Sequence, residues 1–439
     1  MNGSVPMMML PIARARKATV LSLAAGLLSF SAPVRAQAPT SPAKPDAPAN
    51  NYWVYVGAES ADLIQRIRFG PGGTVIEKTI EAGELIADIE GPHGMQISKD
   101  GKWLYVSTGH GQPDGKFWKY ALGPDTLVGA PIFLGFFPAS LDVTPDGLYA
   151  FIANFNLHGD MVPSSQSVVY TPTVTEVARV TTCTMPHGSR VDPQGLHQYS
   201  ACMMDDQLVE IDTRTFDVSR RFSVAKGSEK PIDVTVAMAD MPGMDHASTP
   251  PKPAAPKSTT PMTGKAVPLP PGKAFPVPEA GQSGLHPMAP ATCSPTWAQP
   301  SADGSRVFVA CNKGDEIDDI DSKTWTLTRK LKTGRGPYNL GVTPDGKLLL
   351  ATLKPAGSFE IFDIATGKSL AQLKNSTTLA NGIAVSPDSR YAFVSSEGVG
   401  AAPGKVDVYD LRALVKVGTV DVGQQAGGIA FWKMEPARP

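Results

Sequence analysis

Four of the seven histidines in this 439-residue chain recur at equivalent places in a repeated sequence pattern. His93 and His187 each follow a proline that lies eight residues before an Asp-Gly-like turn, and His110 and His158 come after the next apolar segment. Neutral imidazole is the commonest metal ligand, which allows a metal or haem site. It equally suits a polar pocket for a small anion or a sugar-like molecule. A third interpretation is that these rings satisfy loop carbonyls around a water-filled channel.

Three further polar residues occupy matching positions of the repeat. Tyr338, and Asn381 by analogy, stand where His93 and His187 follow the proline, and Asn154 lies near the end of a second apolar segment. Equivalent positions of a closed repeat meet on one face, so we expect these side chains to share a ligand site with the histidines. The partner would be a small molecule or a protein of unknown identity.

A second candidate site lies in a proline-rich stretch of the chain. Met238, Met241 and Met244 are evenly spaced, and His246 follows them closely. Thioether and imidazole groups are soft ligands that suit Cu(I), so this tract predicts weak copper binding. The alternative is that the methionines belong to a linker of biased composition.

Established catalytic motifs are missing from the sequence. It contains no nucleophile elbow, no HExxH, no P-loop and no Cys-x-x-Cys pair. The paired carboxylates Asp205–Asp206 and Asp318–Asp319 fall in turn-like segments, where structural roles are commoner than acid–base catalysis. We therefore predict a binding or interaction protein. The alternative is an enzyme or redox protein with its site at the same histidines.

The candidate residues lie at the ends of short apolar segments that recur about every 42 to 48 residues. Each copy has an apolar strand, a Pro-Asp-Gly-like turn and a second apolar strand, as in DVTPDGLYAFIAN from Asp142 and GVTPDGKLLLATL from Gly341. A third strand with an Asp-rich turn and a fourth strand rich in Thr and Val complete the unit. Four short antiparallel strands with this period are typical of a β-propeller blade.

The repeat also predicts how the ring closes. Six copies are complete, and the seventh is split between GGIAFW near the C-terminus and YWVYVGAE near the N-terminus. Joining the two halves removes open sheet edges that would invite aggregation. We therefore predict an all-β, seven-bladed β-propeller over residues 51–439, with Gly427–Trp432 pairing beside Tyr52–Gly57.

Two segments break this pattern. Residues 37–50 are rich in Ala and Pro and are typical of a linker, and residues 239–290 form a Pro/Ala-rich insertion within the propeller. Such a composition buries too little apolar surface to offset chain entropy, so the insertion is predicted to be disordered.

The four cysteines fall at repeat positions that predict two disulfide bonds. Cys183 and Cys202 bracket one inner hairpin, and Cys293 and Cys311 bracket the equivalent hairpin further along the chain. Cys202 and Cys311 occupy the same position of the repeat. We therefore expect the pairs Cys183–Cys202 and Cys293–Cys311, as in a protein of an oxidising compartment.

Residues 1–36 have the features of a secretory signal peptide. Arg14, Arg16 and Lys17 precede a short apolar stretch, and a small-x-small cleavage site ends at Ala36. The apolar stretch is too short to span a membrane, and no later segment is long and apolar enough to do so. The formal net charge of −1 argues against a nucleic-acid partner, which would require a basic face. We therefore expect a periplasmic or secreted protein.

The second strands of the repeats resemble those of the YVTN-type β-propeller repeat family, which includes the YncE-like exported propeller proteins. WLYVSTGHG from Trp103, YAFIANFN from Tyr149 and VFVACNK from Val307 stand where that family has its Tyr-Val-Thr-Asn signature. The resemblance implies a scaffold that binds a ligand or partner. Because related seven-bladed proteins are lactonases, it also implies a lactonase-like enzyme as an alternative.

Overall fold

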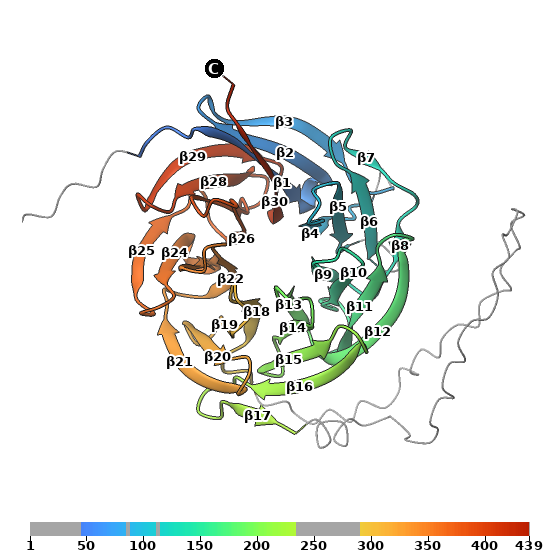
Figure 1. Cartoon of the computed structure of the whole chain (residues 1–439). Coiled ribbons are helices and arrows are strands. Elements are labelled where there is room, and N and C mark those ends of the chain that lie inside the picture. The colour runs from blue at the N-terminus through green and yellow to red at the C-terminus, as the bar shows by residue number, and fades with distance from the viewer. Residues whose placement is uncertain (1–44, 85–87, 111–114, 234–289, 439) are drawn as a thin grey trace, which may run out of the picture. The chain divides into compact units, whose positions relative to one another are not determined.

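The computed structural model describes residues 45–84, 88–110, 115–233 and 290–438. Their strands form seven sheets in a ring (Figure 1), which confirms the predicted all-β, seven-bladed propeller. We number these sheets as blades 1 to 7. Blade 1 contains, from the inside outwards, β30 (Ala426–Pro436), β1 (Asn50–Ala58), β2 (Leu63–Gly70) and β3 (Gly73–Glu81).

The remaining six blades follow one another in chain order. Blade 2 contains β4 (Pro92–Ile97), β5 (Trp103–Thr108), β6 (Lys116–Ala121), β7 (Thr126–Leu127) and β8 (Ile132–Phe133). Blade 3 contains β9 (Pro138–Val143), β10 (Tyr149–Asn154), β11 (Pro163–Tyr170) and β12 (Thr175–Thr184). Blade 4 contains β13 (Pro186–Val191), β14 (His197–Cys202), β15 (Gln207–Asp212), β16 (Asp217–Ser223) and β17 (Lys230–Ile232). Blade 5 contains β18 (Pro295–Pro300), β19 (Arg306–Cys311), β20 (Glu316–Asp321) and β21 (Thr326–Lys332). Blade 6 contains β22 (Pro337–Val342), β23 (Leu348–Leu353), β24 (Ser358–Asp363) and β25 (Ser369–Lys374). Blade 7 contains β26 (Ala380–Val385), β27 (Tyr391–Ser396), β28 (Gly404–Asp410) and β29 (Val415–Val422).

Blade 1 closes the ring as the split repeat predicts. Antiparallel pairing places Val54 opposite Phe431, Tyr55 opposite Ala430 and Val56 opposite Ile429. The inner strand of this blade therefore comes from one end of the propeller sequence and its other three strands from the opposite end (Figure 1).

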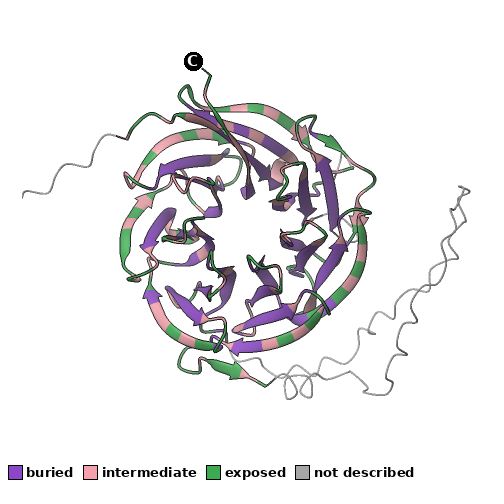
Figure 2. Ribbon diagram, in the orientation of Figure 1, coloured by how far each residue is buried: buried purple, intermediate pink, exposed green. Residues whose placement is uncertain are grey.

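The burial of each strand depends on its distance from the centre of the ring. The second strand β27 is buried along its whole length, whereas the outer strand β3 alternates between exposed and half-buried residues. Figure 2 shows the same change from buried inner strands to a banded outer rim. This explains why the sequence has continuous apolar runs in second strands and polar alternation in fourth strands.

The hydrophobic core lies between the blades. In the described part of the chain, seven apolar clusters each combine residues of two neighbouring blades, so that every joint of the ring has one. The closing joint between blades 7 and 1 packs Tyr391 edge-on against Tyr52 and Phe69, with ring centroids 5.0 Å apart in both pairs. Ring closure therefore completes a core as well as a sheet.

The Pro-Asp-Gly turns join inner strands to second strands. In blade 3, Asp146 accepts hydrogen bonds from the Thr144 hydroxyl at 2.5 Å and from the Leu148 amide at 3.0 Å. Gly147 has a φ of +75°, a conformation that an L side chain would strain. The turn chemistry read from the sequence thus fixes each inner hairpin.

Both predicted disulfide bonds are present, and the described residues include no free cysteine. Cys183 lies in the outer strand β12 of blade 3 and joins β14, so the bond Cys183–Cys202 crosses a blade joint. Cys293 precedes β18 and joins Cys311 at the end of β19, within blade 5. One bond therefore ties two blades together, and the other holds the start of blade 5.

Several sequence expectations lie outside the described residues. These are the signal peptide of residues 1–36, most of the 37–50 linker, nearly all of the 239–290 insertion, and the Met238, Met241, Met244 and His246 tract. Among the described residues, no helix is long and apolar enough to cross a membrane.

Candidate functional site

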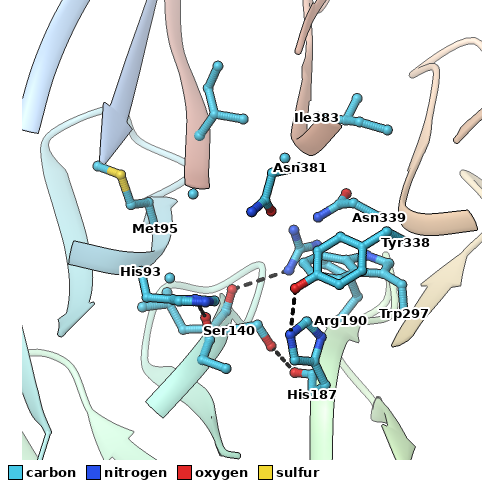
Figure 3. A pocket seen from close by; sticks show the side chains of 16 residues that line it. His93, Met95, Ser140, His187, Arg190, Trp297, Tyr338, Asn339, Asn381 and Ile383 are labelled. Carbon is cyan, nitrogen blue, oxygen red and sulfur yellow. Dashed lines mark hydrogen bonds between the residues drawn. The ribbon is translucent and has the colours of Figure 1, made fainter. Parts of the chain in front are cut away.

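The candidate residues gather where inner strands begin and second strands end, which we call the channel mouth. His93 (β4), His187 (β13), Tyr338 (β22) and Asn381 (β26) are each the second residue of an inner strand. All four line one cavity that is partly open to solvent (Figure 3). The bulge after the first residue of these strands recurs in each blade, so equivalent positions converge on the channel.

Glu59 links two of the histidines. It begins the short 3-10 helix η1 (Glu59–Ala61), and its side chain is only 4% exposed. Its carboxylate accepts a hydrogen bond from Nε2 of His110 at 2.6 Å and lies 3.9 Å from Nε2 of His93. Burial alone would raise the pKa of Glu59, but His93, His110 and Lys354 outweigh it and lower that pKa. The hydrogen bond to Glu59 raises the pKa of His110 against the opposing effect of burial. The pair therefore favours a carboxylate beside an imidazolium.

His187 has the opposite character. Its Nδ1–H donates to the Thr296 carbonyl at 2.9 Å, and its Nε2 accepts from the Tyr338 hydroxyl at 3.0 Å. Burial, together with repulsion from His93 and Lys354, lowers the pKa of His187 to about 3. His187 is therefore a neutral ring that orients Tyr338 at the cavity wall.

A second ion pair lies at the same mouth, between blades 6 and 7. Lys354, the first residue of the 3-10 helix η2 (Lys354–Ala356), is 2.7 Å from the Glu397 carboxylate and stacks 4.4 Å from the centre of the Tyr338 ring. Burial opposes charge on Lys354, but Tyr338, Glu397 and Glu59 outweigh it and raise its pKa. Asn381 donates to the same Glu397 carboxylate at 2.6 Å. The mouth thus carries fixed charges of both signs.

Aromatic rings join the four histidines into one cluster. The Phe137 ring lies 5.3 Å from His93, 4.9 Å from His110 and 5.6 Å from His158, measured between centroids. His93 and His187 are 6.4 Å apart, and His110 and His158 are 5.9 Å apart. His158 is exposed and His187 is buried, so the cluster runs from the surface into the channel.

Asn154 differs from the other candidates. It is fully buried at the end of β10, where its amide donates to Ser165 at 3.0 Å and to Ser167 at 2.9 Å on the neighbouring strand β11. It does not line the cavity. Its side chain holds two strands of blade 3 together.

The histidines are not arranged as metal ligands. Within the described ranges, no group of three or more His, Cys, Asp and Glu side chains is positioned to hold a metal ion. Nδ1 of His93 donates to the Ala139 carbonyl at 2.5 Å, and both nitrogens of His187 have protein partners. The described residues therefore show no metal site at these histidines, and the protein itself uses both ring nitrogens of His187 and one of His93.

The sequence interpretation missed the charged residues of the mouth. Glu59, Lys354 and Glu397 are each the first residue after the second strand of a blade, a position shared by Phe155 and Met203. Superposing the ends of the second strands, rather than searching for histidines, would have revealed these charges. Arg190 on β13 also lines the cavity and had no sequence signal of its own.

Comparison with known proteins supports the fold but not a family. No protein-family model and no curated protein matches the chain, so membership of the YVTN-type family stays a prediction. The structure is similar to the periplasmic gluconolactonase of Pseudomonas aeruginosa, with a TM-score of 0.60 and 14% identity, covering 87% of this chain and 99% of that one. A functionally unknown protein from Desulfotomaculum acetoxidans gives a TM-score of 0.57 at 14% identity, covering 87% and 98%. The hydrazine synthase of Kuenenia stuttgartiensis gives 0.53 at 17% identity, covering 80% and 92%. Likeness at these identities extends to the propeller fold alone.

Proposed function

We propose that this chain is an exported binding protein that takes a small polar molecule into its channel mouth. The observation that carries the proposal is the convergence of His93, His187, Tyr338 and Asn381 on one cavity, flanked by the Glu59–His110 and Lys354–Glu397 pairs. A concave site with a few convergent polar groups is what small-molecule binding requires.

Export to the periplasm or outside the cell belongs to the same proposal. It is supported by the signal-like residues 1–36 and by two disulfide bonds, which persist in oxidising compartments. The solved periplasmic gluconolactonase, which shares the fold, is compatible with this location.

The binding proposal is tested with a thermal-shift screen of small sugars, sugar acids and amino acids. At least one compound should raise the melting temperature of the wild-type protein, and the double variant His93→Ala/His110→Ala should lose that shift. The matched control is His197→Ala, because His197 also pairs with a carboxylate, that of Asp192 at 2.9 Å, but lies away from the cavity. A shift that survives in the double variant, or no shift with any compound, would contradict the proposal.

A second candidate function is lactone hydrolysis, favoured by the Glu59–His110 pair. A carboxylate 2.6 Å from an imidazole of raised pKa holds a proton donor at the channel mouth, beside the cavity-lining His93. Water would add to the lactone carbonyl, the ring C–O bond would break, and the product would be a hydroxy acid, with His110 stabilising the carbonyl oxygen. The fold is shared with a gluconolactonase. Release of acid from glucono-δ-lactone, measured with a pH indicator, should fall at least tenfold in His110→Asn; equal rates for variant and wild type would exclude this role.

A further inference from the structure

Arg190 lines the channel and has no directly paired carboxylate among the described residues. It lies on β13, and its guanidinium carbon is 4.5 Å from the centre of the Trp297 ring (Figure 3). Its Nη1 donates to the Ser189 carbonyl at 2.8 Å and contacts the Leu141 carbonyl at 3.4 Å. Among the described residues, no carboxylate forms an ion pair with Arg190. This differs from the mouth, where Lys354 and His110 each have an acidic partner.

The carboxylate that acts on Arg190, that of Asp142, forms no hydrogen bond with it. Asp142 acts on Arg190 only through space, and its two oxygens accept hydrogen bonds from Gln96 at 2.5 Å and from the Val191 amide at 2.9 Å. Burial lowers the pKa of Arg190, but a guanidinium does not lose its proton in proteins at neutral pH. Arg190 is partly exposed, and its Nε and Nη2 groups have no hydrogen-bond acceptor among the described residues, so this position favours an anion in the channel.

The geometry of the guanidinium indicates which anion fits. Nη1 is used by backbone carbonyls, whereas Nε and Nη2 have no acceptor among the described residues, and the Arg190 side chain lines the cavity. That free edge offers two parallel N–H groups, which match the two oxygens of one carboxylate. One guanidinium fork accommodates one carboxylate, which favours a molecule with a single acid group.

Two more polar atoms in the cavity wall have no partner. They are Nε1 of Trp297 and Oδ1 of Asn339, both buried in residues that line the same cavity. Buried donors and acceptors are nearly always paired, so this part of the channel calls for a molecule with hydrogen-bonding groups of its own. Oδ1 of Asn339 accepts hydrogen bonds, and a hydroxyl group is the simplest donor that a carboxylate-bearing molecule would bring.

We propose that the channel ligand is a small monocarboxylate that carries hydroxyl groups, and that Arg190 binds its carboxylate. This inference rests on the proposed binding function and names its ligand class. Arg190 is a binding residue set deeper than the histidines of the mouth, so the ligand would enter with its carboxylate first.

The experiment compares acids with their neutral amides, which have nearly the same shape. Gluconate and gluconamide, and lactate and lactamide, are titrated into the full-length protein at pH 7 and fixed ionic strength, with sodium chloride as a reference. We expect at least one acid to bind on the order of tenfold more tightly than its amide. That preference should disappear in Arg190→Gln and persist in part in Arg190→Lys, which keeps the charge but loses the fork.

Arg335→Gln is the matched control, since Arg335 is exposed, has only a backbone acceptor and does not line the cavity. It should leave the preference unchanged.

Equal binding of acids and amides would overturn the carboxylate inference while leaving the binding function intact. If chloride alone bound as tightly as the acids, the carboxylate inference would also be overturned, because the cavity would then be a simple ion site. If Arg190→Gln does not fold, Arg190→Lys decides by whether part of the preference remains. If the wild-type protein bound neither acids nor amides, the inference would be overturned. The thermal-shift screen would then test the binding function separately.

Discussion

His110 and His187 lie at the same channel mouth, yet their surroundings favour opposite protonation states. His110 donates to the buried Glu59 carboxylate, and Glu59 stabilises the protonated ring. His187 is enclosed between a carbonyl and a tyrosine hydroxyl, where burial disfavours a charge. A ligand would therefore meet one ring whose protonated form is stabilised and one whose neutral form is stabilised, and pH would affect the two differently.

The Glu59–His110 pair predicts a window of pH-dependent stability. The pKa of Glu59 is lowered from 4.5, so its contribution is present above that value and is lost as the pH falls through its folded pKa. The pKa of His110 is raised from 6.5, so its contribution is present below that value and is lost as the pH rises through its folded pKa. The free energy of unfolding should therefore exceed that of Glu59→Gln most clearly between about pH 4.5 and 6.5. Urea unfolding across this range tests it, and a gap that is constant with pH would contradict it.

His187 should stay neutral in the folded protein down to about pH 4, since its pKa is lowered to about 3. Nitrogen-15 NMR of the imidazole should show the proton on Nδ1, because that atom donates to Thr296. The unfolded chain binds a proton at this ring below about pH 6.5 and the folded chain does not, so its effect on stability grows unfavourable as the pH falls from 6.5 towards 3. Tyr338→Phe should keep this tautomer while shifting the Nε2 resonance. A His187 midpoint near 6.5 would refute the assignment.

At the scale of elements, aspartates in the turns after second strands hold the next blade. Asp62, Asp206 and Asp315 have left-handed backbone conformations, with φ near +50°. Their carboxylates accept from the amides just before β4, β18 and β22, at 2.7 Å in each case. The position of one inner strand is thus set by the blade that precedes it.

Of these three aspartates, Asp206 accepts hydrogen bonds from the most donor groups. It accepts from the Thr292 amide and hydroxyl at 2.6 and 2.8 Å and from the Ser294 amide at 2.7 Å, and it is 6% exposed. Asp206→Ala should therefore lower the free energy of unfolding by about 1–3 kcal/mol, because it leaves buried donors unpaired. Asp146→Ala, in an exposed turn, is the control and should cost less. Chemical denaturation measures both, and equal losses would argue against a special role for Asp206.

The difference between local and distant contacts explains what the sequence could predict. Strands, turns and disulfide positions follow from patterns within one repeat, and the split repeat was enough to pair β1 with β30. The charge pairs of the mouth cross blade boundaries: Glu59 of blade 1 meets His110 of blade 2, and Lys354 of blade 6 meets Glu397 of blade 7. No local spacing encodes such partners. Asn154 instead bonds within its own blade, to Ser165 and Ser167 on the adjacent strand β11.

At the scale of the whole molecule, β30 is both the closing strand and part of the cavity wall. Gly428 and Ile429 line the cavity, and β30 pairs with β1 along most of its length. Deleting residues 426–439 should expose the edge of β1 and remove one wall of the channel. We expect aggregation on size-exclusion chromatography and a lower melting temperature, whereas deleting only residues 438–439 should have little effect. A monomeric, fully stable truncated protein would show that the ring does not depend on closure.

Ring closure also fixes the order in which β1 and β30 become available for pairing during synthesis. Asn50 and Met434, whose side chains are hydrogen-bonded at 3.4 Å, are 384 positions apart, so the ribosome makes β1 long before its inner neighbour. Throughout that interval β1 has one unpaired edge, and contacts between such distant segments form slowly. The wall that β30 gives to the channel arrives last of all. An incomplete chain would therefore lack part of the proposed site, and ligand binding would report that synthesis of the propeller is complete.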